Sequence, residues 1–159
     1  MQILILYYSR TGRTQAMAEA IADGVTQVHG VQALLRTTEE VTEDDFLQSD
    51  GIIAGSPVYF GTMSAQLKGV FDRFITTRKH TVDKIGAAFT SGNHHSGGKE
   101  TTLLSILQAL MIYGMIIVGD PLETGGHYGA ALAGDPTEKG LEDAKLLGVR
   151  VAETVIKLA

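Results

Sequence analysis

The chain has 159 residues, the length of one globular domain, so we expect a single domain over residues 1–159. Hydrophobic residues make up 44% of it and charged residues 19%, as in an ordinary folded protein, and the formal net charge of −5 argues against nucleic-acid binding, which requires a basic face. The absence of cysteine excludes disulfides, thiolate nucleophiles, iron–sulfur clusters and thiolate zinc sites.

Apolar runs of strand length alternate with segments of helical periodicity, the pattern of a parallel sheet covered on both faces. The first run, Ile3 to Tyr8, predicts a central strand. It has no basic leader, and no apolar stretch in the chain reaches the ~18 residues of a membrane span, so we expect a soluble, cytoplasmic protein without a membrane span. A helix over Thr14 to Val28, a strand over Val31 to Leu35 and a short helix capped by Thr42 follow.

The second half continues the alternation. Strands are expected at 51–56, where Pro57 ends the run, at 85–90 and at 115–118, and helices at 63–74 and 101–113. A long loop, Gly119 to Gly134, follows the fifth strand, and loops of that length are often functional. Asp135 as N-cap, with Pro136 and Glu138 behind it, predicts the start of the last helix. Five strands and about five helices in alternation predict a doubly wound α/β sheet.

In such a sheet, ligands bind beyond the carboxyl ends of the strands, so the loops after strands one, three and four are of most interest. The first loop combines three hydroxyl side chains, one glycine and two arginines just before a helix, whose N-terminus attracts anions. It has neither the glycine pattern of a dinucleotide fingerprint nor the Gly-Lys pair of a Walker A loop. An anion site is one interpretation and a capped turn with solvent-facing arginines is the other. The residues concerned are Ser9, Arg10, Thr11, Gly12, Arg13 and Thr14.

The loop after the third strand places two adjacent aromatic residues, Tyr59 and Phe60, at its tip. A flat heteroaromatic ligand would explain them, because aromatic packing adds ~0.5–1.5 kcal/mol beyond burial of area. The alternative is that one ring enters the core and the other lies at a subunit contact. The candidate residues of this loop are Pro57, Val58, Tyr59, Phe60 and Gly61.

Three glycines in the loop after the fourth strand free backbone N–H groups to point toward a ligand. The His94–His95 pair does not indicate a metal site, since adjacent loop residues rarely converge on one ion and no third ligand has the right spacing. We therefore expect no metal, and a surface position for one of the two histidines is the alternative to ligand contact. The candidate residues here are Ser91, Gly92, Asn93, His94, His95 and Gly97.

Five motifs in order along the chain give it a resemblance to a known family. They are Leu6-Tyr7-Tyr8-Ser9 with Gly12, Gly55-Ser56-Pro57 with 60–64, Ser91-Gly92 with 97–101, Tyr113 to Val118, and Gly125 to Ala130. Nearly end to end, the chain resembles the flavodoxin superfamily, and within it the tryptophan-repressor-binding-protein-like NAD(P)H:quinone oxidoreductases. It departs from that family in two places. Arg36 to Asp50 is too short for the usual insertion after the second strand, and Ile112-Tyr113 stands where the family has two histidines.

The resemblance implies a flavodoxin-like five-stranded sheet of order 2-1-3-4-5 that binds flavin mononucleotide (FMN). Ser9 to Thr14 would hold the FMN phosphate, Pro57 to Gly61 would follow the isoalloxazine edge, and Ser91 to Gly97 would cover the ribityl chain and the pyrimidine end. The activity implied is hydride transfer from NAD(P)H and reduction of a quinone or similar small acceptor.

Three functional hypotheses remain open: an FMN-dependent oxidoreductase, a flavodoxin-type one-electron carrier, and a flavin-independent binding module. The first is favoured, because the 91–98 loop has no aromatic residue to shield the flavin and the net charge is small for electrostatic docking. His127 and Tyr128 in the long loop are candidate catalytic residues, with loop packing as their alternative role. The helix over 101–113 is apolar on more than one face, which predicts a homodimer or homotetramer, unless neighbouring helices and the long loop cover it.

Overall fold

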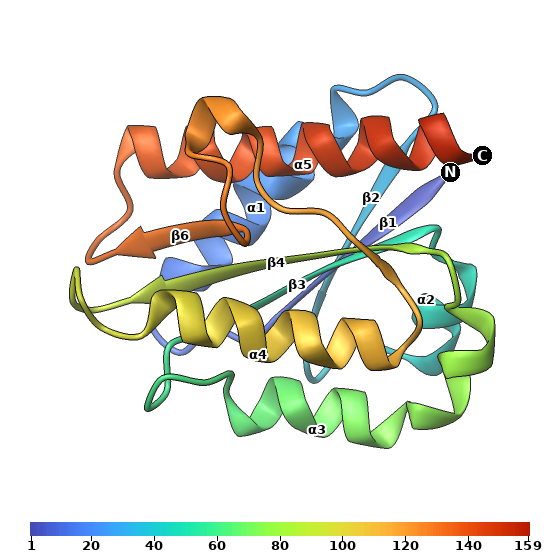
Figure 1. Ribbon diagram of the computed structural model, residues 1–159, viewed down its shortest axis with the longest axis horizontal. Helices are drawn as coiled ribbons and strands as arrows, with labels where there is room; N and C mark the ends of the chain where they lie inside the picture. The colour runs from blue at the N-terminus through green and yellow to red at the C-terminus, as the bar shows by residue number, and fades with distance from the viewer.

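The structure, a computed structural model, describes every residue from Met1 to Ala159. It is a parallel sheet with helices on both faces (Figure 1). The strand order β2-β1-β3-β4-β5 confirms the expected flavodoxin-like topology. In chain order the elements are β1 Gln2–Tyr7, α1 Arg13–Thr26, β2 Gln32–Thr37, α2 Glu43–Gln48, β3 Gly51–Pro57, α3 Ala65–Arg73, the 3₁₀ helix η1 Ile75–His80, β4 Ile85–Gly92, α4 Lys99–Ile112, β5 Ile116–Ile117, the 3₁₀ helix η2 Leu122–Thr124, β6 Ala130–Ala133 and α5 Glu138–Leu158.

The central strands are buried on both faces and separate two hydrophobic cores. In β1, Ile3 and Ile5 face the core beneath α1 and α5, whereas Leu4 and Leu6 face the core beneath α2, α3 and α4. This alternation follows from the period-two geometry of a strand. Figure 1 shows α5 and α1 above the sheet and α3 and α4 below it. Because both faces are covered, the edges and the ends of the sheet are left for ligands. None of the helices has the length and apolar content needed to cross a membrane.

Helices α1 and α5 cross in close contact because a glycine lies on each at the crossing. A Cβ on Gly24 would lie 2.0 Å from the Lys145 carbonyl oxygen, and one on Gly148 would lie 2.2 Å from that of Ile21. Neither position accepts a side chain without moving the helices apart. This contact fixes α1, whose N-terminal end lies at the carboxyl edge of the sheet.

The five predicted strands are present, but the 119–134 segment, which was expected to be a long loop, contains one further short strand, β6. β5 has only two residues and pairs with the first residues of β4, while β6 pairs with Phe89 to Gly92 at its end. The short β5 leaves the far half of that β4 edge unpaired, and Ala130–Ala133 fills it in parallel. Gly134 then donates its N–H to the Gly92 oxygen at 2.8 Å. The fifth position of the sheet is therefore shared by two strands, with η2 and a glycine-rich segment between them.

The last helix starts two residues later than Asp135 and Pro136 predict. Thr137 is the N-cap, and its hydroxyl accepts a hydrogen bond from the Gly140 N–H at 3.1 Å. The Asp135 carboxylate is drawn instead to Arg13, with Nη2 and Oδ1 2.8 Å apart. A long-range ion pair thus removes the residue that local sequence favours as the cap, and Thr137 takes that role.

Candidate functional site

A cleft of about 360 Å³ lies beyond the carboxyl ends of β1, β3 and β4. It is at the point where the strand order reverses, since β1 connects to β2 on one side and pairs with β3 on the other. All three loops singled out in the sequence contribute to it. Its lining consists of Arg10, Thr11, Arg13, Pro57, Val58, Tyr59, Ser91, Gly92 and Asn93.

The first loop presents free backbone donors to the cleft. Gly12, the N-cap of α1, has φ 86°, and its N–H donates to the Ser9 hydroxyl at 3.2 Å. The Ser9 hydroxyl also accepts from the Gln15 N–H at 3.3 Å. The N–H groups of Thr11, Arg13 and Thr14 have no acceptor in the protein. Together with the positive end of the α1 dipole, these donors suit an anion.

Arg13 joins three segments around the cleft. Its guanidinium forms the ion pair with Asp135 and also donates to the Asn93 side-chain oxygen at 3.2 Å. It therefore ties the start of α1 to the loop after β4 and to the turn before α5. Arg10, in contrast, is exposed and has no ion pair, so its charge is available to a ligand.

The two threonines of the first loop have different surroundings. Thr14 is buried, and its hydroxyl lies 2.8 Å from the Ser91 hydroxyl, a contact that joins α1 to the end of β4. Thr11 is exposed and lines the cleft. The Thr11 hydroxyl has no partner within the protein, whereas the Thr14 hydroxyl already shares one hydrogen bond with Ser91.

The second loop is a tight two-residue turn. Tyr59 and Thr62 exchange backbone hydrogen bonds of 3.1 Å, and Phe60 and Gly61 between them have φ of 52° and 79°. A left-handed conformation costs a non-glycine residue about 1 kcal/mol or more and is often found at functional sites. The Phe60 side chain is fully exposed at the tip, and Tyr59 lines the cleft.

Tyr8, which is part of the first family motif but was not a candidate site residue, lies beside this turn. Its ring meets that of Tyr59 edge to face, with centroids 6.3 Å apart. Burial and the neighbouring Tyr59 side chain raise the pKa of Tyr8 above its ordinary value, so its hydroxyl stays neutral in the physiological range. Its position directly after β1 was the available signal, because that is where ligand-binding residues concentrate in this kind of sheet.

The third loop reaches the cleft only through its first residues. His94 and His95 are exposed and lie outside the lining, and their carbonyl oxygens accept hydrogen bonds from the Lys99 ammonium. Gly98 caps α4 in a left-handed conformation, and a Cβ there would come within 2.9 Å of Gly61 Cα. The second and third loops are therefore packed against each other at the start of α4.

His127 and Tyr128 do not line the cleft. They lie in a second hollow of about 200 Å³ at the edge of the sheet, where the buried carboxylate of Asp120 anchors the loop that carries them. Asp120 was not a sequence candidate, because its partners are two backbone N–H groups and the Thr124 hydroxyl, which no motif reveals. The lining of this hollow consists of Lys99, Glu100, Leu103, Asp120, Thr124, His127, Tyr128, Gly129, Ala130, Ala131 and Asp143.

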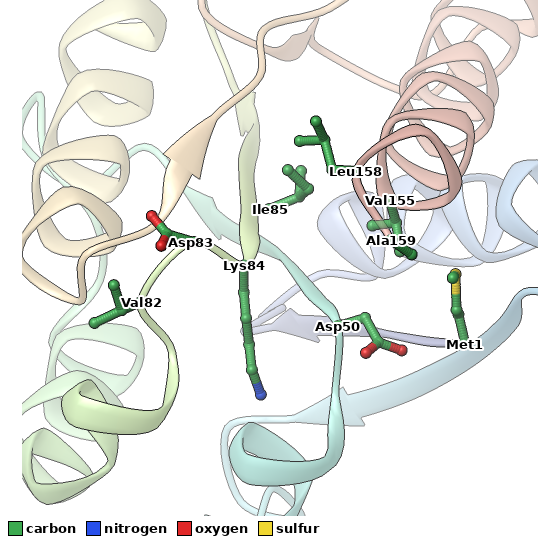
Figure 2. A pocket seen from close by; sticks show the side chains of 9 residues that line it. All are labelled: Met1, Asp50, Val82, Asp83, Lys84, Ile85, Val155, Leu158 and Ala159. Carbon is green, nitrogen blue, oxygen red and sulfur yellow. The ribbon is translucent and has the colours of Figure 1, made fainter.

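A third hollow, of about 190 Å³, lies at the opposite, amino end of the sheet, where both chain termini line it. Figure 2 shows Lys84 extending away from Val155 and Leu158. Its ammonium donates to the carbonyl oxygens of Phe46 and Leu47, at the end of α2. Burial lowers the pKa of Lys84. This lysine stabilises a helix terminus, and the carboxyl-edge cleft remains the candidate functional site.

Comparison with known proteins identifies a family for this chain. The model of the NADPH-dependent FMN reductase family matches residues 1–126. An NAD(P)H dehydrogenase (quinone) of Archaeoglobus fulgidus is 39% identical over 99% of this chain and 98% of its own length. That alignment runs over 188 positions, more than the 159 residues of this chain, so the relative has segments that this chain lacks.

Other relatives carry the name flavodoxin. One from Aquifex aeolicus is 37% identical over 97% of this chain and 86% of its own length. Among solved structures, a flavodoxin, WrbA-like protein from Agrobacterium tumefaciens superposes with a TM-score of 0.84, with 27% identity over 98% of both chains.

Proposed function

The chain belongs to the NADPH-dependent FMN reductase family, and from this premise we propose that it holds FMN in the carboxyl-edge cleft and transfers electrons from NAD(P)H to a quinone or similar small acceptor. The observation that carries the proposal is the convergence of three loops on one cleft, with free N–H groups at one end and Tyr59 at the other. Its volume of about 360 Å³ is within the range of small-molecule sites.

The residues present fit FMN. A phosphate would meet the unpaired N–H groups of Thr11 and Arg13, the Thr11 hydroxyl and the guanidinium of Arg10, all at the start of α1. The planar ring would lie along Pro57 to Tyr59, with Ser91 to Asn93 along the other side. The single glycine of the first loop suits one phosphate, because a dinucleotide pyrophosphate calls for the additional glycines of a Rossmann fingerprint.

When bound, FMN supplies the redox chemistry by accepting hydride from the nicotinamide and passing electrons to the acceptor. The chain itself binds and orients. Arg13 holds the first and third loops together through Asn93, which fixes the width of the cleft. Tyr59 is braced by Tyr8, and the raised pKa of Tyr8 keeps the Tyr8 hydroxyl neutral, so that it places no charge beside the ring. The absence of aromatic side chains in 91–98 leaves room for a nicotinamide to approach.

The assembly that we propose is a homodimer or homotetramer. Leu104, Met111 and Ile112 are exposed on the outer face of α4, and Ile116 is exposed on the neighbouring strand β5. An exposed apolar face of this kind is a frequent mark of a subunit contact.

Anaerobic titration of the FMN-loaded protein tests the proposed activity. NADH or NADPH is expected to bleach the flavin absorbance stoichiometrically, and a benzoquinone is expected to restore it over many turnovers. Flavin that neither nucleotide reduces, but that dithionite does, would overturn the proposal.

That second result would support a flavodoxin-type one-electron carrier, which is the alternative function. The 37% identity to the A. aeolicus flavodoxin is the observation that favours it. The two functions differ in the donor, so the nicotinamide titration separates them without knowledge of the physiological acceptor.

A further inference from the structure

The hollow that contains His127 and Tyr128 lies beside the proposed FMN cleft, on the open edge of the sheet. Its β6 residue Ala130 pairs with Phe89, and Gly92, three residues further along β4, lines the cleft. A Cβ on Gly92 would lie 3.2 Å from Cγ of Lys99, which lines the hollow, so the two hollows adjoin. A volume of about 200 Å³ is below that of typical drug-sized sites and matches one sugar-sized group.

The wall of this hollow is held in place by the protein itself. Asp120 is 8% exposed, and its carboxylate accepts hydrogen bonds from the N–H groups of His127 at 2.7 Å and Gly129 at 3.1 Å and from the Thr124 hydroxyl at 2.8 Å. A Cβ on Gly129 would lie 2.0 Å from the Ala88 carbonyl oxygen, so this backbone packs directly on β4. A preformed wall lowers the ordering cost of binding.

The polar groups that remain available are the Tyr128 hydroxyl, the His127 ring and one carboxylate, that of Glu100. The Lys99 ammonium is bound to the carbonyl oxygens of His94 and His95, and the Asp143 carboxylate is paired with Lys139 at 2.9 Å. Glu100 is exposed and has no hydrogen-bond or ion-pair partner in the protein. Its carboxylate can accept hydrogen bonds from hydroxyl groups and repels a phosphate.

We propose that this hollow is a subsite for the adenosine ribose of the nicotinamide nucleotide, with Glu100 accepting hydrogen bonds from the ribose hydroxyls, and that the protein prefers NADH to NADPH. A carboxylate on the ribose 2′-hydroxyl is the feature by which nucleotide sites select NAD over NADP, because a 2′-phosphate removes the donor and adds negative charge. The inference rests on the proposed function and names the donor of the same reaction.

The test uses two probes that lack the nicotinamide ring, ADP-ribose and 2′-phospho-ADP-ribose, titrated calorimetrically into the FMN-loaded protein. ADP-ribose is expected to bind at least about tenfold more tightly than its phosphorylated form, because the 2′-phosphate removes the hydrogen bond from the ribose 2′-hydroxyl to the charged Glu100 carboxylate. The Glu100→Gln variant is expected to lose most of that difference by weakening ADP-ribose binding about tenfold. Glu123→Gln, also exposed and on the same loop as His127 but outside the hollow, is the matched control.

Equal or tighter binding of the phosphorylated probe, no binding of either probe, or an unchanged affinity in Glu100→Gln would overturn the proposal. The ratio of kcat/KM for NADH to that for NADPH gives a second readout, and it is expected to fall in Glu100→Gln. A failure of the proposed function is separate: neither nucleotide would then reduce the FMN, although ADP-ribose still bound through Glu100.

Discussion

Gly12 and Gly30 adopt the same left-handed backbone, with φ of 86° and 87°, and a Cβ at either position would meet nothing within 4 Å. Alanine at each is therefore expected to cost a similar ~1–2 kcal/mol of conformational strain. Only Gly12 lies between the free N–H groups of Thr11 and Arg13, so relaxation of the turn there would also turn those donors away. We predict that Gly12→Ala and Gly30→Ala destabilise the apoprotein equally in urea, whereas only Gly12→Ala weakens FMN binding. Equal FMN affinities in a fluorescence titration would contradict the placement of the phosphate.

The buried hydroxyl of Tyr113 is expected to make the free energy of unfolding depend on pH in the alkaline range. Burial raises the pKa of its hydroxyl from 10.0 to about 12, and that hydroxyl donates to the Phe71 carbonyl oxygen at 2.6 Å. Between these two values the unfolded chain loses the proton and the folded chain keeps it. The free energy of unfolding is therefore expected to fall as the pH rises through that window, by up to about 1.4 kcal/mol for each unit of pH.

Urea unfolding at neutral pH and at several values between 10 and 12 measures this slope. Tyr113→Phe is expected to have a shallower slope, although a less stable fold at neutral pH because the Phe71 carbonyl loses its donor. Tyr7, whose pKa burial also raises, leaves a residual slope in the variant. Tyr128→Phe removes an exposed hydroxyl and serves as the control. Parallel slopes for the parent and Tyr113→Phe would show that this proton is not retained on folding.

Residue composition predicted the lining of the cleft better than the roles of individual side chains. The hydroxyl-rich and aromatic loops were visible because their composition is unusual for turns, and topology brings them to one edge. The contact between Thr14 and Ser91 and the anchoring of a loop by Asp120 depend on partners that only the folded chain brings close. No local pattern predicts such contacts, because they link residues that are adjacent only after the strands have paired.

Among the helices and strands, the helix caps show the same difference between features that local sequence determines and features that depend on distant residues. The prediction that Thr42 caps the short α2 helix is confirmed: its hydroxyl accepts from the Asp45 N–H at 3.2 Å, and its own N–H donates to the Asp45 carboxylate at 2.8 Å. That cap involves only neighbours in sequence. At α5 the predicted cap Asp135 pairs with Arg13 from across the molecule. Local rules held where no distant partner competed.

The two candidate caps of α5 give a direct test. Thr137→Ala removes the acceptor of the Gly140 N–H and is expected to lower the free energy of unfolding by about 1 kcal/mol. Asp135→Ala removes a mostly exposed ion pair and is expected to change it by less than about 0.5 kcal/mol. Thermal or urea unfolding of the two variants decides between them. A larger loss in Asp135→Ala would place the cap at Asp135 after all.

The edge of the sheet is the element that sequence periodicity described least well. β5 lies within the predicted strand 115–118 but has only two residues, and β6 consists of three alanines and a leucine, which lack the bulk that marks a strand. Both are fixed by β4, which pairs with β5 at Ile85 and Gly86 and with β6 at Phe89 to Gly92. The length of the 119–134 segment indicated that it was unusual, but the sequence did not predict the structure that it adopts.

At the scale of the whole molecule, the distribution of exposed apolar side chains is uneven. On α4, Leu103, Ile106, Leu107 and Leu110 fill the core, while Leu104, Met111 and Ile112 recur at seven- and eight-residue spacing on the opposite side. The three are 38%, 54% and 58% exposed. Helical spacing places them in one stripe. Polar side chains would be expected there if this face of the helix met only water.

The last prediction follows from this stripe. A second copy of the chain can cover it by a two-fold contact between α4 helices, because an isologous interface pairs the same apolar surface with itself. We expect a dimer or tetramer by light scattering at micromolar concentration, and a monomer once Met111 and Ile112 are both replaced by lysine, since two charges would then be buried without partners. Leu122→Lys, at a side chain that is 87% exposed on η2 and outside the stripe, is expected to leave the assembly unchanged. The double variant should still bind FMN with the parent affinity, because α4 contributes to the carboxyl edge only at its other end. A monomeric parent protein, or a double variant that keeps the parent's mass, would show that the stripe is not the subunit contact.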